Sequence, residues 1–397
     1  MTLKAMENCK GTSTRVAIVS FDIQKAFDSV SHGKLMEHLQ QKFNISLNSR
    51  RWLQAFLSDR CFCVKVGSSF SDWSHITCGV PQGTVLGPVL YNAATAGLQD
   101  IKLSDGAEST LYADDLLLIK RISTVEEEQQ LQDDCNILNS YYNQETLQLN
   151  GQKTRLSASV SPQHQRPLLC PLTVNGCQVD KVSSLKYLGV TFDERLTFEE
   201  HGTIVSSKAR KMLAAISTTL RKWKMSSQIK KIYECCIRPV MTYGIAVTYP
   251  RTAAGRRRLE RVNKIAAQMI LRKQDCSYEE LLRKLNWESI NWMMVKDLLR
   301  IMHGYVLLDR QHGDSEVCMI LIEKETGRRT GRTSNFHSYR TSDPHHRLSR
   351  TAESAIHRMV VLWNSLPNEI VNIDNWRIFL EKISQTETKT ALTTVIK

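Results

Sequence analysis

The sequence predicts an α+β fold, in which helices flank an antiparallel sheet, followed by a helical region and an α-rich tail. Three observations carry this prediction. Residues 16–21 are a short apolar run rich in β-branched side chains, as in a buried strand. Residues 110–119 form two apolar arms around Ala113-Asp114-Asp115, a pattern typical of a hairpin. From about residue 196 to 308 the apolar spacing becomes helical.

The other elements of the predicted sheet unit follow in chain order. Residues 32–43 and 48–57 have the apolar spacing of helices, and residues 61–66 alternate as in a strand. Residues 78–87 contain three glycines and a proline, which predicts a loop, and a helix follows over about 88–98.

Two further elements complete this part of the chain. Residues 125–142 have helical spacing. Asn175-Gly176, within residues 172–182, is the strongest two-residue hairpin signal, because both residues tolerate the positive φ that such a turn requires.

Positive charge is concentrated in the helical region. The chain of 397 residues has a formal net charge of +13. Residues 201–273 contain 17 Lys or Arg against two acids, Glu234 and Glu260, a surplus of 15 that leaves the remaining chain near −2. Such a local surplus predicts a polyanion-binding surface, and nucleic acid is the expected partner. A solvated helix face is the alternative.

The composition excludes a collagen, a mucin and a wholly disordered chain. Apolar residues make up 42% and charged residues 23%, as in ordinary globular proteins. No stretch approaches the roughly 18 uncharged apolar residues of a membrane span, and the N-terminus lacks the apolar core of a secretory signal. The 11 cysteines are scattered without a CxxC pair, which predicts reduced thiols. We therefore expect an intracellular protein, in the cytoplasm or the nucleus.

Carboxylates end two of the predicted strands. Asp22 follows the first strand, and Asp114 and Asp115 lie in the predicted hairpin. A carboxylate beside a buried strand is costly unless it is paired or binds a cation. Three converging carboxylates suit hard cations such as Mg²⁺, although an isolated acidic pair is more often a solvated turn.

Five segments resemble, in the same order, the motifs of reverse transcriptases. They are FDIQKAFDSV at 21–30, GVPQGTVLGP at 79–88, YADD at 112–115, LNGQKT at 149–154 and YLGVTF at 187–192. The first and third resemble the catalytic motifs, the second the glycine-rich motif and the last the primer grip. The form is that of non-LTR (LINE-type, jockey-like) retrotransposons, and WNSLP at 363–367 resembles the end of their open reading frames.

The resemblance implies RNA-directed DNA synthesis by two-metal nucleotidyl transfer to a primer 3′-hydroxyl. Asp22 and Asp114 would hold two Mg²⁺ ions, with the backbone carbonyl of Ile23 as a further ligand and Asp115 as a supporting acid. Lys153 would protonate the leaving pyrophosphate or offset its charge; a surface lysine is the alternative.

The same resemblance assigns the substrate contacts. Phe27 stands where the family has a ring that excludes a ribose 2′-hydroxyl, with core packing as the alternative. Gln82 and Gly83 would contact the nucleotide and the template. The residues expected to hold the primer terminus are Tyr187, Leu188 and Gly189.

The basic helices would form a thumb that contacts an RNA–DNA duplex through its phosphates. The residues expected to do so are Lys208, Arg210, Lys211, Arg221, Lys222 and Lys224. A second cluster, formed by Arg256, Arg257, Arg258 and Arg261, would bind template RNA or target DNA; a solvated helix face is an equal alternative.

The predicted domains are a palm with its primer-grip hairpin over residues 1–195, a thumb over 196–308 and a tail over 309–397. The first catalytic motif begins at Phe21, so the family's fingers region is expected to be largely absent, and polymerase activity weak. The expected partners are an RNA template, a DNA primer and deoxynucleoside triphosphates. The alternatives are a catalytically idle nucleic-acid-binding remnant and, with less support, an intron maturase-like or telomerase-like factor.

Overall fold

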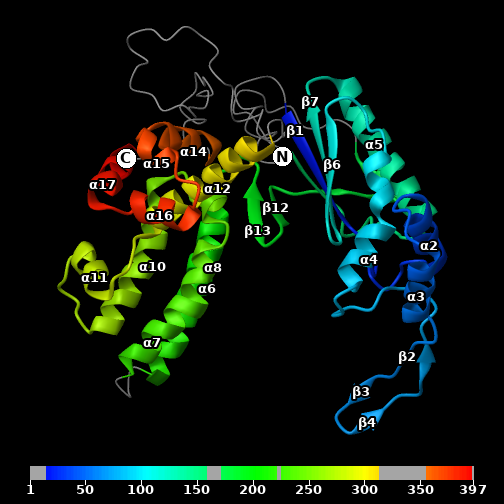
Figure 1. Ribbon diagram of the computed structural model, residues 1–397, viewed down its shortest axis with the longest axis horizontal. Helices are drawn as coiled ribbons and strands as arrows, with labels where there is room; N and C mark the ends of the chain where they lie inside the picture. The colour runs from blue at the N-terminus through cyan, green and yellow to red at the C-terminus, as the bar shows by residue number, and fades with distance from the viewer. Residues whose placement is uncertain (1–14, 159–170, 221–224, 313–354, 396–397) are drawn as a thin grey trace. The chain divides into compact units, whose positions relative to one another are not determined.

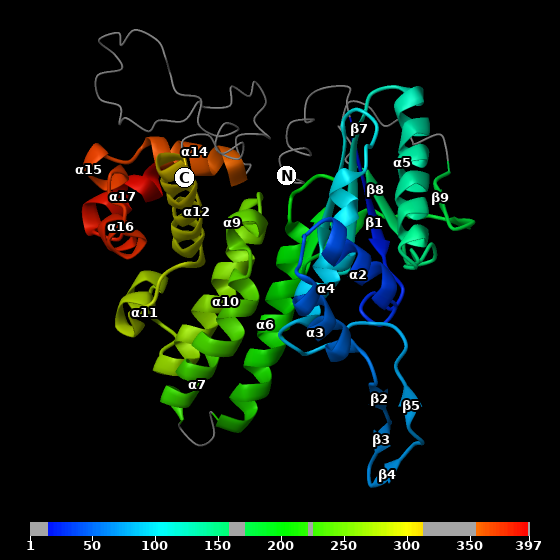
Figure 2. The ribbon, with the colours of Figure 1, turned by 45° about the vertical axis from the view of Figure 1, so that its right-hand side comes forward.

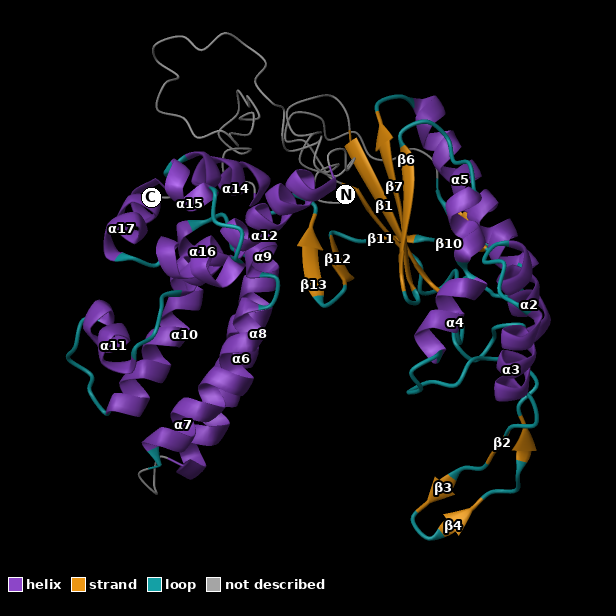
Figure 3. Ribbon diagram, viewed as in Figure 1, coloured by secondary structure: helices purple, strands orange, loops and turns teal. Residues whose placement is uncertain are grey.

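A computed structural model describes residues 15–158, 171–220, 225–312 and 355–395 (Figure 1). The chain divides into two compact units, Met1–Gly189 and Val190–Lys397. The first contains the sheet and the second is largely helical (Figure 3). All cysteines in the described part of the chain are free thiols, as predicted.

The first unit is built on a five-stranded sheet in the order β11-β8-β1-β7-β6. Its strands are β1 (Arg15–Asp22), β6 (Ala107–Tyr112), β7 (Asp115–Ile122), β8 (Arg155–Ala158) and β11 (Asp180–Lys181). β1 pairs antiparallel with β7 and β8, and β6 pairs antiparallel with β7, as predicted. β11 differs, because it runs parallel to β8. Two parallel neighbours cannot be joined by a tight hairpin turn, and the predicted antiparallel pairing does not extend to this edge of the sheet.

Helices cover one face of this sheet (Figure 3). They are α2 (His32–Gln41), α4 (Gly87–Ala94) and α5 (Val125–Gln144), and the short 3₁₀ helix Ala96–Asp100 follows α4. Alternate side chains of β1, among them Val19 and Phe21, pack in one core with Leu35, Leu90 and Leu138 of the three helices. β1 is buried along most of its length, which explains its continuous apolar sequence.

A long β-ribbon extends from the first unit beyond α3 (Leu47–Leu57) (Figures 1 and 2). It contains β2 (Cys61–Phe62), β3 (Lys65–Val66), β4 (Ser69–Phe70) and β5 (Ser74–His75), with β2 paired to β5 and β3 to β4. The single strand predicted over residues 61–66 is therefore wrong, since it is broken in two. At the break, Val64 donates its N–H to the Ser71 hydroxyl (2.8 Å) and not to a backbone carbonyl.

Two short hairpins complete the sheet unit and its boundary. The hairpin of β9 (Thr173–Val174) and β10 (Cys177–Gln178) turns at Asn175-Gly176, as predicted, and both turn residues have positive φ. The hairpin of β12 (Ser184–Tyr187) and β13 (Val190–Asp193) turns at Leu188-Gly189, with φ of +47° and +79°.

The second unit consists mainly of helices, as the sequence pattern predicts. They are α6 (Glu199–Leu220), α7 (Ser226–Ile232), a π-helical turn (Tyr233–Ile237), α8 (Arg238–Thr242), α9 (Ile245–Thr248), α10 (Ala253–Leu271), α11 (Tyr278–Leu285), α12 (Ile290–His312), α14 (Ala355–Asn364), α15 (Asn368–Val371), α16 (Trp376–Ile383) and α17 (Thr386–Val395). α14 and α16 pack on α12. Trp363 and Phe379 are fully buried there, so Trp363 of the WNSLP segment is a core residue.

Candidate active site

The sheet brings the predicted carboxylates to one end. Asp22 is the last residue of β1 and is the cross-strand partner of Asp115, the first residue of β7. Such partners have Cβ atoms about 5 Å apart. Asp114 lies in the β6–β7 turn beside Ala113, whose φ of +53° is unusual for a residue with a Cβ. The hairpin predicted from the sequence thus places Asp114 and Asp115 next to Asp22.

The charges of these carboxylates oppose one another. Partial burial raises the pKa of Asp115, and the nearby charges of Asp114 and Asp22 raise it further. A bound cation would relieve this repulsion. Within the described ranges, no three His, Cys, Asp or Glu side chains are arranged to hold a metal ion by themselves. The donor set still fits Mg²⁺, which commonly binds one or two protein carboxylates and takes its other ligands from water and substrate phosphates.

Lys153 lies against the first of these carboxylates. Its Nζ is 3.4 Å from Oδ2 of Asp22, and both side chains are partly exposed. The two residues line an open pocket of about 670 Å³ together with Ile23, Lys25 and Asn150. Ile23 is buried and forms an isolated bridge with Leu149, which joins the end of β1 to the Lys153 segment. The structure therefore brings Lys153 and Ile23 to the carboxylate site.

The glycine-rich loop lies against the segment that follows Asp22. Gly79 donates its N–H to Val30 O (2.7 Å) and Val80 donates to Phe27 O (2.8 Å). A Cβ on Gly79 would lie 2.8 Å from the carbonyl oxygen of Asp28, so glycine is required there. Farther along the loop, Gln82 donates to the Asp28 carboxylate (3.4 Å). The exposed Gly83 has a φ of +76° and open space around it.

Phe27 is partly buried and rests on a second ring. Its ring stacks on that of Tyr91, with centroids 4.6 Å apart and planes inclined by 15°. Tyr91 is fully buried, and its hydroxyl has no hydrogen-bond partner among the described residues. Burial raises the pKa of Tyr91, and the charge of Asp114 raises it further, so this ring pair lies near the carboxylates. The sequence did not reveal Tyr91, which looked like one apolar residue of a core helix.

One of the predicted primer-grip residues, Tyr187, lies near the carboxylates. Tyr187 is partly buried. Burial is the larger cause that raises its pKa, and the charge of Asp115 is the smaller one. Leu188 and Gly189 form the adjacent turn, in which Gly189 is exposed. The structure therefore brings Tyr187 within electrostatic reach of the site.

The predicted duplex-binding residues are only partly described. Lys208, Arg210 and Lys211 are exposed on α6. Arg221, Lys222 and Lys224 lie outside the described residues. Arg210 and Arg272 line an open groove between α6 and α10, whose floor includes Leu213 and Met269.

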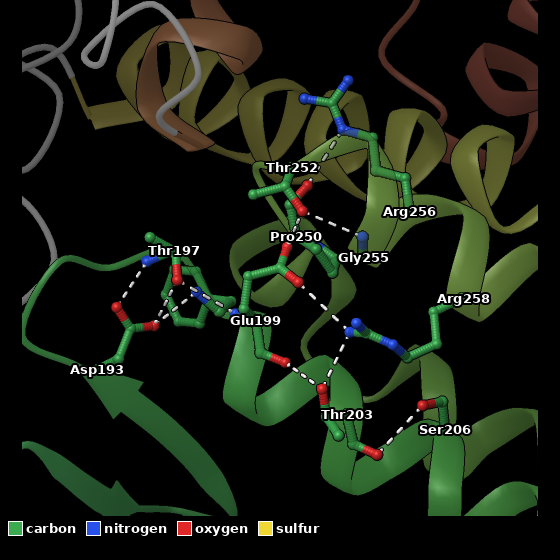
Figure 4. Close-up of polar contacts among 11 residues, drawn as sticks. Asp193, Thr197, Glu199, Thr203, Ser206, Pro250, Thr252, Gly255, Arg256 and Arg258 are labelled. Atoms are coloured by element: carbon green, nitrogen blue, oxygen red, sulfur yellow. Dashed lines mark hydrogen bonds and ion pairs between the residues drawn. The ribbon is translucent and has the colours of Figure 1, made fainter.

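Two arginines of the second basic cluster have structural partners (Figure 4). Arg258 pairs with Glu199 (3.3 Å) and donates to the hydroxyl of Thr203 (2.9 Å), which ties α10 to α6. Arg256 donates to the carbonyls of Pro250 (3.1 Å) and Arg251 (2.9 Å). Arg257 and Arg261 of the same cluster are exposed. The sequence alone could not separate these two pairs, because the partners of Arg258 lie more than fifty residues away.

The loop before α6 is ordered by one carboxylate (Figure 4). Asp193 accepts hydrogen bonds from the N–H groups of Thr197 (3.0 Å) and Phe198 (2.7 Å) and from the Thr197 hydroxyl (3.1 Å). This arrangement fixes the start of the helix that carries the exposed lysines.

Among the described helices, none combines the length and the apolar character needed to cross a bilayer.

Comparisons with known proteins relate this chain to reverse transcriptases. The family described as reverse transcriptase (RNA-dependent DNA polymerase) matches residues 2–192. A probable RNA-directed DNA polymerase from transposon BS of Drosophila melanogaster is 31% identical over 268 residues, covering 66% of this chain and 29% of that protein. The RNA-directed DNA polymerase from mobile element jockey of Drosophila funebris is 30% identical over 259 residues, covering 63% and 27%.

The chain thus spans less than a third of the length of these relatives. Among solved structures, a telomerase of Candida albicans in complex with a fragment of telomeric RNA aligns at 14% identity and a TM-score of 0.35, over 68% of this chain and 49% of that one. The resemblance predicted from five motifs is confirmed by the family match: residues 2–192 match the reverse transcriptase (RNA-dependent DNA polymerase) family, and the chain is similar to RNA-directed DNA polymerases from two mobile elements.

Proposed function

We propose that this chain catalyses RNA-directed DNA synthesis, with an RNA template, a DNA primer and deoxynucleoside triphosphates as substrates. The observation that carries the proposal is the cross-strand pairing of Asp22 with Asp115, with Asp114 in the adjoining turn and Lys153 Nζ 3.4 Å from Asp22 Oδ2. The family uses divalent metal ions. Carboxylates at the end of a strand, with the long side chain of a lysine beside them, are chemically suited to nucleotidyl transfer.

Asp22 and Asp114 would hold two Mg²⁺ ions, with Asp115 and the Ile23 carbonyl in support. When bound, the ions supply Lewis acidity for the attack of the primer 3′-hydroxyl and for the departure of pyrophosphate. Lys153 would stabilise the charge that develops on the pyrophosphate, or donate a proton to it. Its contact with Asp22 keeps the ammonium group within the same pocket.

The neighbouring residues would bind and orient the substrates. The Phe27 ring, supported by Tyr91, would exclude a 2′-hydroxyl by steric contact. Gln82 and Gly83 would contact the nucleotide and the template, since the backbone at Gly83 is open to a ligand. Tyr187, with the Leu188-Gly189 turn, would hold the primer terminus.

The helical unit would bind the RNA–DNA duplex through its phosphates. The exposed residues that support this role are Lys208, Arg210 and Lys211 of α6. We propose the domain organisation predicted from the sequence: a palm over residues 1–195, a thumb over 196–308 and a tail over 309–397.

Primer extension tests this function directly. Wild-type chain is given poly(rA)/oligo(dT), dTTP and Mg²⁺, beside Asp114→Asn and a matched control, Asp105→Asn, which changes an exposed aspartate elsewhere in the same unit. We expect incorporation by the wild type and by Asp105→Asn, and none by Asp114→Asn. Salt-sensitive duplex binding without incorporation by the wild type would instead favour the hypothesis of a catalytically idle nucleic-acid-binding protein.

A further inference from the structure

Asn150 connects the Asp22 carboxylate to the turn that carries Lys153. Its side-chain amide donates to Oδ2 of Asp22 (3.3 Å), and its backbone N–H donates to the Asp22 carbonyl (2.7 Å). Its side-chain oxygen accepts the backbone N–H of Lys153 (3.3 Å). One partly buried side-chain amide therefore contacts two of the charged residues of the proposed chemistry, Asp22 and Lys153.

The two side-chain contacts on Asp22 meet at one atom. The Asn150 amide and the Lys153 ammonium both lie within 3.4 Å of Oδ2. Two donors on a single oxygen restrict rotation of the carboxylate about its Cβ–Cγ bond. The orientation of the other oxygen toward a ligand is then set by the protein before any ligand arrives.

The Asn150 backbone also shapes the turn. Its carbonyl accepts the N–H groups of Lys153 (3.2 Å) and Thr154 (3.0 Å) and the Thr154 hydroxyl (2.8 Å). The preceding carbonyl, of Leu149, accepts the Asn175 amide (2.6 Å), which fastens the segment to the β9–β10 hairpin. The position of Asn150 is thus fixed from two sides, so that its side chain can hold another group in place.

We infer that Asn150 is a positioning residue of the proposed active site, which orients Asp22 for cation binding and holds the turn that presents Lys153. This inference rests on the proposed function, in which Asp22 is a cation ligand. Asparagine suits the task because its side chain offers a donor to the carboxylate and an acceptor to the Lys153 N–H. Aspartate would add a third negative charge beside Asp22, and leucine would provide neither contact.

Mn²⁺ binding to the full chain tests the inference without requiring catalysis. The fraction of free Mn²⁺ is measured by electron paramagnetic resonance for the wild type, Asn150→Ala, Asn150→Ser and Asp22→Asn. The serine hydroxyl can still accept the Lys153 N–H but is too short to reach the Asp22 carboxylate. Gln152→Ala is the matched control, because Gln152 is an exposed residue of the same turn.

We expect Asn150→Ala and Asn150→Ser to weaken Mn²⁺ binding by about 10- to 100-fold, the usual effect of removing a partner of a metal ligand. Gln152→Ala should bind as the wild type does, and Asn150→Ser should keep the wild-type melting temperature. In primer extension, Asn150→Ser should lower kcat while the KM for dTTP changes little.

Wild-type Mn²⁺ affinity in Asn150→Ser, together with loss of binding in Asp22→Asn, would overturn the role of Asn150 and leave the proposed function intact. Binding that is unaffected by Asp22→Asn would overturn both, because Asp22 would then hold no cation.

Discussion

Replacing Lys120 by Met should destabilise the sheet unit strongly. Lys120 lies on β7, the strand that begins with Asp115, and its side chain is fully buried. Its Nζ lies 3.4 Å from Oδ2 of Asp134 on α5, which is 1% exposed, and it also donates to Gln130 (3.2 Å) and to the Ser104 hydroxyl. After the substitution, the buried Asp134 carboxylate keeps the Ser104 N–H and hydroxyl as its donors within the described part of the chain.

The expected magnitude follows from this burial. Removing one partner of a buried ion pair costs about 3–5 kcal/mol, because the remaining charge is desolvated without compensation. Asp134→Asn alone should cost a similar amount, since it strands the ammonium group. The double variant removes both charges and keeps an acceptor for the Ser104 N–H, so it should be less destabilised than the sum of the two single variants by about 2 kcal/mol.

Native-state hydrogen exchange of β7 and α5 is the suitable assay, because it reports the opening free energy of these elements separately from the helical unit. Lys34→Met is the matched control, because the Lys34–Glu37 pair spans 3.8 Å with side chains 44% and 59% exposed. That change should stay within about 0.5 kcal/mol. A cost for Lys120→Met as small as that of Lys34→Met would refute the reasoning.

Three further predictions concern the site and the basic helix. Asp115→Asn should raise the melting temperature at pH 7, because burial and the neighbouring carboxylates raise the pKa of Asp115 above its ordinary value of 3.8, so that its ionised form destabilises the fold. Calorimetry should show that this gain in melting temperature disappears below pH 3.8, and a gain that does not depend on pH would contradict the cause. Phe27→Ala should increase the use of ribonucleotides relative to deoxynucleotides in competitive primer extension, whereas unchanged selectivity would mean that the ring only packs the core. Lys208→Gln combined with Lys211→Gln should reduce the slope of log affinity for an RNA–DNA duplex against log salt by about 2, and a wild-type slope would exclude these two lysines from the interface.

The sequence predicted those parts of the fold that depend on local pattern. The buried strand β1, the hairpin that carries Asp114 and the Asn175-Gly176 turn all follow from apolar spacing and turn chemistry. The strand over 61–66 failed because a side-chain hydroxyl, Ser71, replaced a backbone partner at Val64. The alternation of apolar and polar residues cannot reveal that a side chain takes the place of a backbone hydrogen-bond partner.

Contacts between distant residues were beyond the sequence. The stacking of Phe27 on Tyr91 and the hydrogen bond from Asn150 to Asp22 join residues 64 and 128 positions apart. The Arg258–Glu199 ion pair likewise joins residues 59 positions apart and links α10 to α6. The motifs predicted which residues form the candidate site, but only the fold shows which residues contact and support them.

Template-directed incorporation tests whether this chain is an RNA-directed DNA polymerase. Wild-type chain and Asp114→Asn are each incubated with Mg²⁺ and poly(rA)/oligo(dT), and incorporation of labelled dTTP is compared with that of dATP. We predict that the wild type incorporates dTTP and not dATP, and that Asp114→Asn incorporates neither. Equal incorporation by Asp114→Asn, or incorporation that ignores the template base, would contradict it.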